Sequence, residues 1–428
     1  MTPLGQDDRH VQEPRDAGPG TAPEEPQADA CVPRYLGTGQ DHPAFDIEFE
    51  PVLCRSGELK AIVVFRDIQS ARVMTFDDMA SELSEEDSKR VTDFVLAHAS
   101  DWAYPSEFHP GECLGPVSGR MEFDWGSQPL KARLVSACDR ARGYLRGHIR
   151  FWNEADEDMV VCFALSTYFK EMFEYAPRLL IRGMKDSGKS TLLDFLREVC
   201  YHGNLSSDTR ESSLFRMIDE CSVTPLLDEY QDYDKLAQDD IKKVLKNGNV
   251  RNRSVQRVEK TSKGAFKPQS YSIYAPVAFV HQAGGRAIPD EVISRAISIN
   301  MVSWTSIGLP MKADRDELRE IRDELYTIRC MWRADPSRAG LDEIFEGVLE
   351  ELQSPGGIDV GGTRMTFINR MRDIMGTMYT VARMTGREQA VAKAFSAMQK
   401  ESVDEEKSSH VGKLFMALMA CMKSKMAC

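Results

Sequence analysis

The feature that most constrains this chain is the motif Gly183-Met184-Lys185-Asp186-Ser187-Gly188-Lys189-Ser190, which directly follows a short apolar strand predicted over residues 178–182. Its spacing, G-x-x-x-x-G-K-S, is the pattern of a phosphate-binding loop between a strand and a helix. The glycines let backbone N–H groups turn inward around phosphate oxygens at the start of the helix, where the helix dipole also favours an anion. Residues 191–199 continue as the predicted helix. We therefore expect the chain to bind a nucleoside triphosphate.

Each position of this loop has an expected role with ATP and Mg²⁺. Lys189 is expected to reach the β- and γ-phosphates as a catalytic cation, and the Ser190 hydroxyl is expected to ligate the metal. The residues predicted to contact the nucleotide are Gly183, Ser187, Gly188, Lys189, Ser190 and Thr191.

A second apolar strand, predicted over residues 223–227, ends in Asp228 and Glu229. In proteins with a phosphate-binding loop, an acidic pair at such a strand end supplies the carboxylates that hold the metal ion and activate water. Asp228 is expected to hold the Mg²⁺ shell, and Glu229 to polarise the attacking water as the catalytic base. The alternative is a solvated strand end, and the phosphate-binding loop upstream favours the metal-site interpretation.

Two further positions are predicted on weaker grounds. Gln282, or His281 beside it, lies at the end of the third predicted strand, over residues 276–280, and could orient the attacking water; the alternative is a packed polar strand end. Arg295 directly precedes the fourth predicted strand, over residues 296–301. A guanidinium there could reach the γ-phosphate of a neighbouring subunit and stabilise transition-state charge. The alternative for Arg295 is an internal ion pair with Asp290 or Glu291.

Residues 242–267 form the one basic concentration of the chain, with nine cationic residues and a single acid, Glu259. The alternation over 255–260 predicts a strand, and residues 261–264 can turn the chain back. A basic hairpin inserted here could hold a phosphate backbone without reading sequence. The predicted DNA contacts are Arg257, Lys260 and Lys263. The alternative is a solvated charged face.

With these motifs the sequence resembles the AAA+-type P-loop ATPase domain family of uncharacterised function found in primase–helicase-like proteins of phages, plasmids and mobile elements. The resemblance covers residues 134–422. It is carried by Ala176-Pro177-Arg178-Leu179, Ser213-Leu214-Phe215-Arg216, Leu227-Asp228-Glu229, Lys246-Asn247-Gly248, Tyr274-Ala275-Pro276-Val277-Ala278, Ile288-Pro289-Asp290, Ser294-Arg295 and Asn369-Arg370 with Asp373. Tyr230-Gln231 departs from the family, which usually has Ala and an acid there.

The resemblance implies an ATPase motor that acts on DNA during replication of a mobile element. It implies the same roles for Lys189, Ser190, Asp228, Glu229 and Arg295. It also implies that Arg370, near the start of a lid helix, contacts the nucleotide as a second-sensor arginine.

The predicted fold class is α/β, with an AAA+-like P-loop core built on a parallel sheet. The predicted parts are a disordered tail over 1–44, an N-terminal α+β accessory module over 45–133, the ATPase core over 134–305 and an all-α lid over 306–428. In the accessory module we expect a hairpin from segments 45–49 and 59–65, then a helix from about residue 84 to 99. In the core we expect helices over 134–145 and 156–173.

Composition excludes several classes of protein. The ten cysteines include no CxxC pair, so neither a zinc ribbon nor a disulfide framework is expected. No secretory signal and no apolar run of membrane-spanning length occurs, so we expect a cytoplasmic protein without a membrane partner. The net charge of −13 excludes a protein that coats polyanions with its whole surface.

The expected function is a DNA helicase or translocase that hydrolyses ATP in a ring of subunits, a hexamer. An alternative is a non-translocating switch ATPase whose ATP state controls a partner protein. A small-molecule kinase is disfavoured, because kinases of that size rarely carry a large helical lid and an arginine-finger position.

Overall fold

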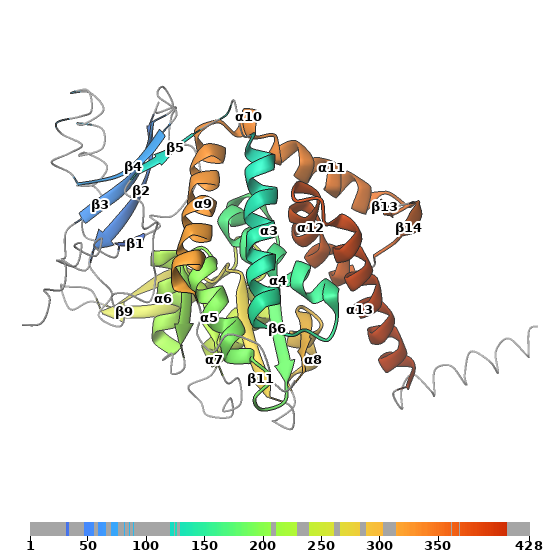
Figure 1. The fold of residues 1–428 in the computed structure, drawn as a ribbon. Helices are drawn as coiled ribbons and strands as arrows, with labels where there is room; N and C mark the ends of the chain where they lie inside the picture. The colour runs from blue at the N-terminus through green and yellow to red at the C-terminus, as the bar shows by residue number, and fades with distance from the viewer. Residues whose placement is uncertain are drawn as a thin grey trace, which may run out of the picture.

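The computed structural model describes residues 31–33, 47–54, 59–65, 70–75, 81, 85, 89, 120–123, 125, 129–206, 211–228, 239–260, 266–282, 288–302, 314–360, 362–367 and 369–408. Its centre is a five-stranded parallel sheet in the order β12-β6-β11-β8-β7 (Figure 1). The strands are β6 (Arg178–Gly183), β7 (Gly203–Ser206), β8 (Thr224–Leu227), β11 (Val277–Gln282) and β12 (Ile297–Met301). The predicted α/β core with a parallel sheet is confirmed.

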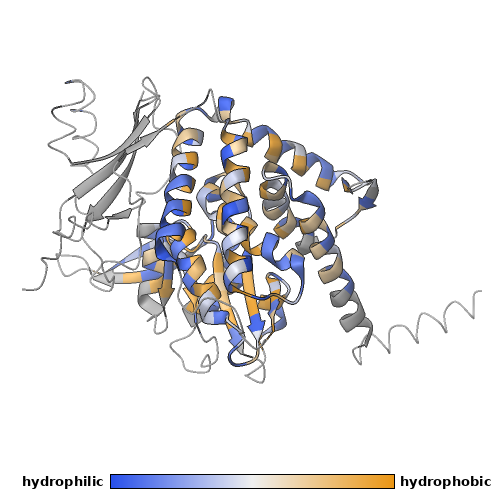
Figure 2. Cartoon of the chain, in the orientation of Figure 1, coloured by the Kyte–Doolittle hydropathy of each residue, from blue (hydrophilic) through white to orange (hydrophobic). Residues whose placement is uncertain are grey.

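Helices cover both faces of this sheet, which explains why its strands are almost continuously apolar (Figure 2). Along β6, Leu179 and Ile181 face one hydrophobic core, and Leu180 between them faces the other. The first core lies under α3 (Leu130–His148), α4 (Glu154–Ser166), α5 (Lys189–Val199) and α9 (Arg315–Ala334). The second lies under α6 (Glu211–Cys221), α7 (Asp239–Asn247) and α8 (Asp290–Ile293).

The helix predicted over 134–145 lies within α3. The helix predicted over 156–173 is shorter than expected, because α4 ends at Ser166 and a 3₁₀ helix, η2 (Thr167–Met172), follows. At this junction the Ser166 and Thr167 hydroxyls donate to carbonyl oxygens three residues back, at 2.7 and 2.6 Å. Such local side-chain bonds compete with the regular helical pattern. Phe169 then leaves helical geometry, with φ −121° and ψ 21°.

The segment after residue 306 is not wholly helical, which corrects the all-α expectation. Between α11 (Leu341–Gln353) and α12 (Asn369–Met384) lies a small antiparallel hairpin of β13 (Ile358–Val360) and β14 (Thr363–Met365). Gly357 precedes it with φ +67°, where a Cβ would lie 2.1 Å from the Met365 carbonyl oxygen. Short α10 (Pro336–Ala339) precedes α11, and α13 (Glu388–Ser408) ends the described chain.

The N-terminal part forms a five-stranded antiparallel sheet in the order β1-β2-β3-β4-β5. The strands are β1 (Cys31–Pro33), β2 (Ile47–Cys54), β3 (Leu59–Phe65), β4 (Ser70–Thr75) and β5 (Arg120–Glu122). The predicted hairpin is therefore confirmed as β2–β3. Strand β1 lies inside the segment expected to be disordered, so that expectation does not hold for these three residues. The rest of residues 1–44 lies outside the described residues, and of the helix predicted from about residue 84 only Glu85 and Lys89 are described, both as helical.

Within the described part of the chain, no helix combines the length and the apolar composition needed to cross a bilayer.

Candidate nucleotide-binding site

The loop between β6 and α5 has a backbone that few residue types can adopt. Gly188 has φ +86°, and Asp186 has φ 61°, a region that Asp tolerates better than most non-glycine residues. A Cβ on Gly183 would lie 2.4 Å from Ser187 Oγ and 3.0 Å from the Met301 carbonyl oxygen. The loop therefore requires glycine at 183 for space and favours it at 188 for backbone conformation.

Helix α5 begins inside this loop without a side-chain cap. Its N-cap is Gly188, and the first helical hydrogen bond runs from the Leu192 N–H to the Gly188 carbonyl at 3.0 Å. The N–H groups of Lys189, Ser190 and Thr191 consequently have no acceptor within the helix. Together with the positive end of the helix dipole, they form an anion-binding site of the kind that holds phosphates.

The Lys189 side chain folds back over the loop. Its ammonium donates to the carbonyl oxygens of Gly183, at 3.1 Å, and of Met184. Burial lowers the pKa of Lys189, and the carboxylates of Asp228 and Asp186 oppose this to a smaller extent. A phosphate beside the ammonium would, like these carboxylates, raise the pKa of Lys189 and so favour its charged form.

Strand order brings the second predicted element to the loop. Strand β11 lies between β6 and β8, with Gln282 opposite Gly183 and Phe279 opposite Leu227. Asp228 follows Leu227 directly, is half-buried, and lies close enough to Lys189 to affect its pKa. The fold thus gathers the phosphate loop, Asp228 and the end of β11 at one edge of the sheet. The side chains of Gln282 and Glu229 lie outside the described residues, so their roles stay predictions.

Two contributors to the loop were not assigned roles from sequence. Met301, at the end of β12, is opposite Gly183 in register, and its carbonyl limits the space there. Asp186 adopts the left-handed conformation and acts electrostatically on Lys189. Asp186 occupies a variable position of the motif, and Met301 is distant in sequence, so neither carried a recognisable signal.

We expect Gly183→Ala to weaken ATP binding by about 5- to 150-fold, which corresponds to 1–3 kcal/mol of local backbone strain. The added Cβ would displace either Ser187 or the Met301 carbonyl from its place beside the loop. Gly143→Ala in α3 is the matched control, because a Cβ there meets nothing within 4 Å. Titration calorimetry with ATP and thermal melting would separate a local from a global effect. Parent affinity in Gly183→Ala would contradict the packing argument.

Arg295 lies at the opposite edge of the sheet from its own phosphate loop. It precedes β12, whose first residue, Ile297, pairs with Leu179 near the start of β6, whereas Met301 pairs with Gly183 at the end. Arg295 lies in the turn before β12, and the four residue steps from Ile297 to Met301 span a length on the order of 13 Å. Arg295 therefore lies at the opposite end of β12 from the phosphate loop of its own subunit.

The surroundings of Arg295 include a second arginine. Arg178 is fully buried and its guanidinium donates to the Val244 carbonyl oxygen at 2.5 Å. Burial, and secondarily the positive charge of Arg295, lower the pKa of Arg178 to about 9. The Arg295 guanidinium itself donates to the backbone carbonyl of Glu291, whose carboxylate contacts Lys246. The internal ion pair with Asp290 or Glu291 stays the alternative role of Arg295.

Helix α12 contacts the sheet near the start of β6. The Thr377 hydroxyl donates to the Tyr175 carbonyl oxygen at 2.6 Å, three residues before β6 begins. Arg370 stands in the first turn of α12, and its side chain lies outside the described residues. Its second-sensor role stays a prediction.

The predicted basic hairpin is present, between α7 and β11. Strands β9 (Ser254–Lys260) and β10 (Phe266–Ser272) pair antiparallel over their full length, and Figure 1 shows the ribbon extending sideways from the core. Its base is fixed where the Ala176 N–H donates to the Asn249 carbonyl at 2.8 Å. The predicted turn over 261–264, which contains Lys263, lies outside the described residues.

Several cations of the basic segment have partners within the fold. Lys246 contacts the Glu291 carboxylate, so Glu259 is not the only acid that offsets the segment's charge. The Arg251 guanidinium donates to the Glu171 carbonyl, and that of Arg257 lies 5.5 Å from the ring centre of Phe215 in α6. These three cations are therefore engaged inside the protein.

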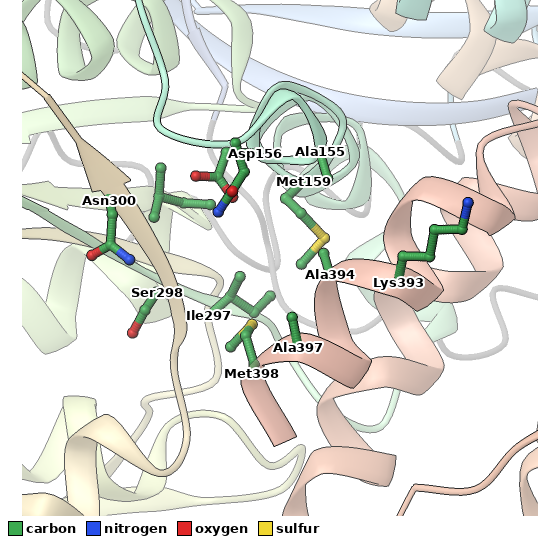
Figure 3. A pocket seen from close by; sticks show the side chains of 12 residues that line it. Ala155, Asp156, Met159, Ile297, Ser298, Asn300, Lys393, Ala394, Ala397 and Met398 are labelled. Atoms are coloured by element: carbon green, nitrogen blue, oxygen red, sulfur yellow. The ribbon is translucent and has the colours of Figure 1, made fainter. Parts of the chain in front are cut away.

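A cavity of about 210 Å³ lies beside the outer strand β12, between that strand, the start of α4 and α13 (Figure 3). It is lined by Asn153, Ala155, Asp156, Met159, Ile297, Ser298, Ile299, Asn300, Lys393, Ala394, Ala397 and Met398. None of the predicted nucleotide contacts lines it, and it is smaller than the roughly 300–1,000 Å³ of typical ligand pockets. It is therefore separate from the phosphate loop.

Comparison with known proteins yields likenesses of structure alone, since no family model and no curated protein matches. The chain is similar to a solved structure titled "SCCmec type IV Cch - active helicase", with 12% sequence identity and a TM-score of 0.34, over 88% of this chain and 74% of that one. It is also similar to the apo A form of the NrS-1 C-terminal region, with 10% identity and a TM-score of 0.28, over 65% of this chain and 66% of that one. The assignment of the nucleotide site therefore rests on the chain's own residues.

Proposed function

We propose that this chain is an AAA+-type ATPase that binds ATP and Mg²⁺ at the loop between β6 and α5. The observation that carries the proposal is the juxtaposition of this loop with Asp228 across β11. Open N–H groups at the start of α5 would hold the β- and γ-phosphates, with Lys189 as the cation. Ser190 and Asp228 would hold Mg²⁺ together with phosphate oxygens, and Glu229 would orient and deprotonate the attacking water.

We also propose that the chain works in a ring of subunits, a hexamer, and the position of Arg295 supports this proposal. An arginine at the far end of β12 from its own phosphate loop would act in catalysis if another subunit brought a nucleotide to it. Each interface would then combine the loop of one subunit with Arg295 of the next. Gln282 and Arg370 would contribute to the same site as sensors of the γ-phosphate.

DNA is the proposed substrate of the motor, and the basic hairpin supports it. A polyanion would offset the positive charge that remains on the hairpin in a protein of net charge −13. The second candidate is a switch ATPase that controls a partner protein without translocating. Internal partners of Lys246, Arg251 and Arg257 favour that candidate, because they reduce the number of cations available to DNA.

We expect steady-state ATP turnover to rise severalfold when single-stranded or forked DNA is added, because a motor couples hydrolysis to its track. Lys189→Ala should abolish turnover with and without DNA, since it removes the cation at the phosphates. A coupled ATPase assay checks both. Turnover that depends on Lys189 but ignores DNA would favour the switch ATPase, and turnover that survives in Lys189→Ala would contradict the nucleotide site itself.

A further inference from the structure

A large aromatic side chain of the ATPase core lies in solvent near the phosphate loop. Trp152, in the connection between α3 and α4, is 67% exposed. Its indole ring carries a large apolar surface, so its exposure forgoes free energy that a buried position would recover. Single exposed apolar residues are common on protein surfaces, and the position of Trp152 is what gives its exposure a meaning.

Backbone contacts attach Trp152 to the outer strand of the parallel sheet. The connection lies antiparallel to β12, where Phe151 forms a bridge with Met301. The Trp152 N–H donates to the Asn300 carbonyl oxygen at 3.2 Å. Met301 in turn pairs with Gly183, the first residue of the phosphate loop. The Trp152 backbone therefore lies two strand spacings, on the order of 10 Å, from the end of β6.

The two neighbouring residues of this connection have different surroundings. Phe151 packs against the hydrophobic core that lies under α5, and Met301 belongs to the same core. Trp152 follows Phe151 directly, and its ring lies outside that core. The connection is thus held in place by Phe151 and by two backbone contacts to β12, while the Trp152 ring remains accessible to a ligand.

A second large apolar side chain is exposed at the same edge of the sheet. Met184 is 68% exposed and directly follows Gly183 in the phosphate loop. Thioethers make favourable contacts with aromatic rings. Met184 and Trp152 come from different segments of the chain, and the pairing of β12 with β6 brings both segments to this edge. Apolar surface beside a phosphate site suits the uncharged part of a phosphate ester.

The order of the strands indicates which end of a nucleotide would face Trp152. Asp228 follows β8, on one side of β6, and lies close enough to Lys189 to affect its pKa. Because Asp228 is the proposed Mg²⁺ ligand, the metal and the terminal phosphates would lie toward that side. Strand β12, and Trp152 with it, lies on the other side of β6. A nucleotide held in this orientation extends its base toward Trp152.

We infer that Trp152 is the platform on which the base of the bound nucleotide stacks. A flat indole offers a face to the flat ring of a base, and stacking needs no hydrogen-bond partner. The contact adds affinity for the nucleoside part of ATP, which lies beyond the phosphate loop. The inference rests on the proposed ATP site, and it adds a residue that distinguishes a nucleotide from a bare polyphosphate.

The test compares ATP with inorganic tripolyphosphate, each with Mg²⁺, by titration calorimetry of the full chain. Trp152→Ala should weaken the binding of ATP by about 5- to 150-fold, the range for loss of one base–aromatic stack. Its affinity for tripolyphosphate should equal that of the parent, because this ligand has no base. Lys189→Ala should weaken the binding of both ligands, since it removes the cation at the phosphates.

Two variants serve as controls. Trp152→Phe keeps an aromatic ring and should retain most of the affinity for ATP. Asn153→Ala changes the adjacent residue, whose side chain makes no capping hydrogen bond to α4 and lines the separate cavity beside β12. Its affinity for ATP should match that of the parent. Thermal melting should be unchanged in Trp152→Ala, because the ring that it removes is exposed.

Tryptophan emission gives an independent signal of stacking. ATP should change the emission of the parent, and tripolyphosphate should not. The chain has five tryptophans, so Trp152→Phe is needed to assign the signal. In that variant the change caused by ATP should disappear while ATP still binds. A change of equal size in Trp152→Phe would mean that another tryptophan reports binding, and it would contradict the stacking of the base on Trp152.

The outcomes distinguish this inference from the proposed function. If Trp152→Ala binds ATP like the parent, or loses affinity for tripolyphosphate to the same extent, the stacking platform is wrong while an ATP site that depends on Lys189 stands. An equal loss in Asn153→Ala also overturns it, since the connection rather than the ring would then matter. If Lys189→Ala binds both ligands like the parent, the proposed nucleotide site is wrong, and the inference fails with it.

Discussion

Glu229→Gln is expected to hydrolyse ATP about 10²- to 10⁴-fold more slowly than the parent, while its affinity for ATP and Mg²⁺ stays unchanged. Glutamine keeps the shape of the side chain but cannot accept the proton of the attacking water. The phosphates and metal are assigned to other residues, Lys189, Ser190 and Asp228. Binding and hydrolysis should therefore separate, which single-turnover kinetics and equilibrium binding of ATP measure independently.

Asp228→Asn is the matched comparison for this prediction. It removes a charged metal ligand at the neighbouring position, so its turnover should recover in part at high Mg²⁺ concentration, whereas that of Glu229→Gln should not. The acidic pair is misassigned if Glu229→Gln turns over ATP at the parent rate, or if Mg²⁺ restores its activity.

Arg295→Ala is expected to lower kcat by about 10³- to 10⁵-fold, the range known for arginine fingers. The reason is that its guanidinium would face the γ-phosphate of the adjacent subunit, where negative charge develops during transfer. Parent turnover per subunit should also rise with protein concentration as subunits associate. ATP turnover measured across a dilution series checks this dependence.

A mixing experiment decides whether Arg295 acts between subunits. Arg295→Ala subunits keep an intact phosphate loop, and Lys189→Ala subunits keep an intact arginine. When the two inactive variants are mixed, some interfaces combine both intact groups, and part of the activity should return. Complete absence of rescue in oligomers shown to be mixed would indicate that Arg295 only supports the fold near Arg178 and Glu291.

Local sequence determined the parts of this protein that depend on neighbouring residues. The phosphate loop could be predicted because Gly183 and Gly188 meet conformational demands within eight residues of chain. The β9–β10 hairpin could be predicted because alternation over 255–260 and a polar turn are local signals. Strand β7 was missed because Gly203–Ser206 is short and polar, so that only pairing with β8 makes it a strand.

Tertiary structure decided the arrangements that join distant segments. Sequence identified Asp228, but only the insertion of β11 between β6 and β8 brings it to Lys189. Arg295 stood out as a candidate, and the direction of β12 then separated it from its own phosphate loop. Basic composition marked the hairpin, but packing of its base on α6 decided that Arg257 faces inward and Phe266 outward. Charge and pattern are properties of residues, whereas the side of a strand that faces solvent depends on which face the rest of the protein covers.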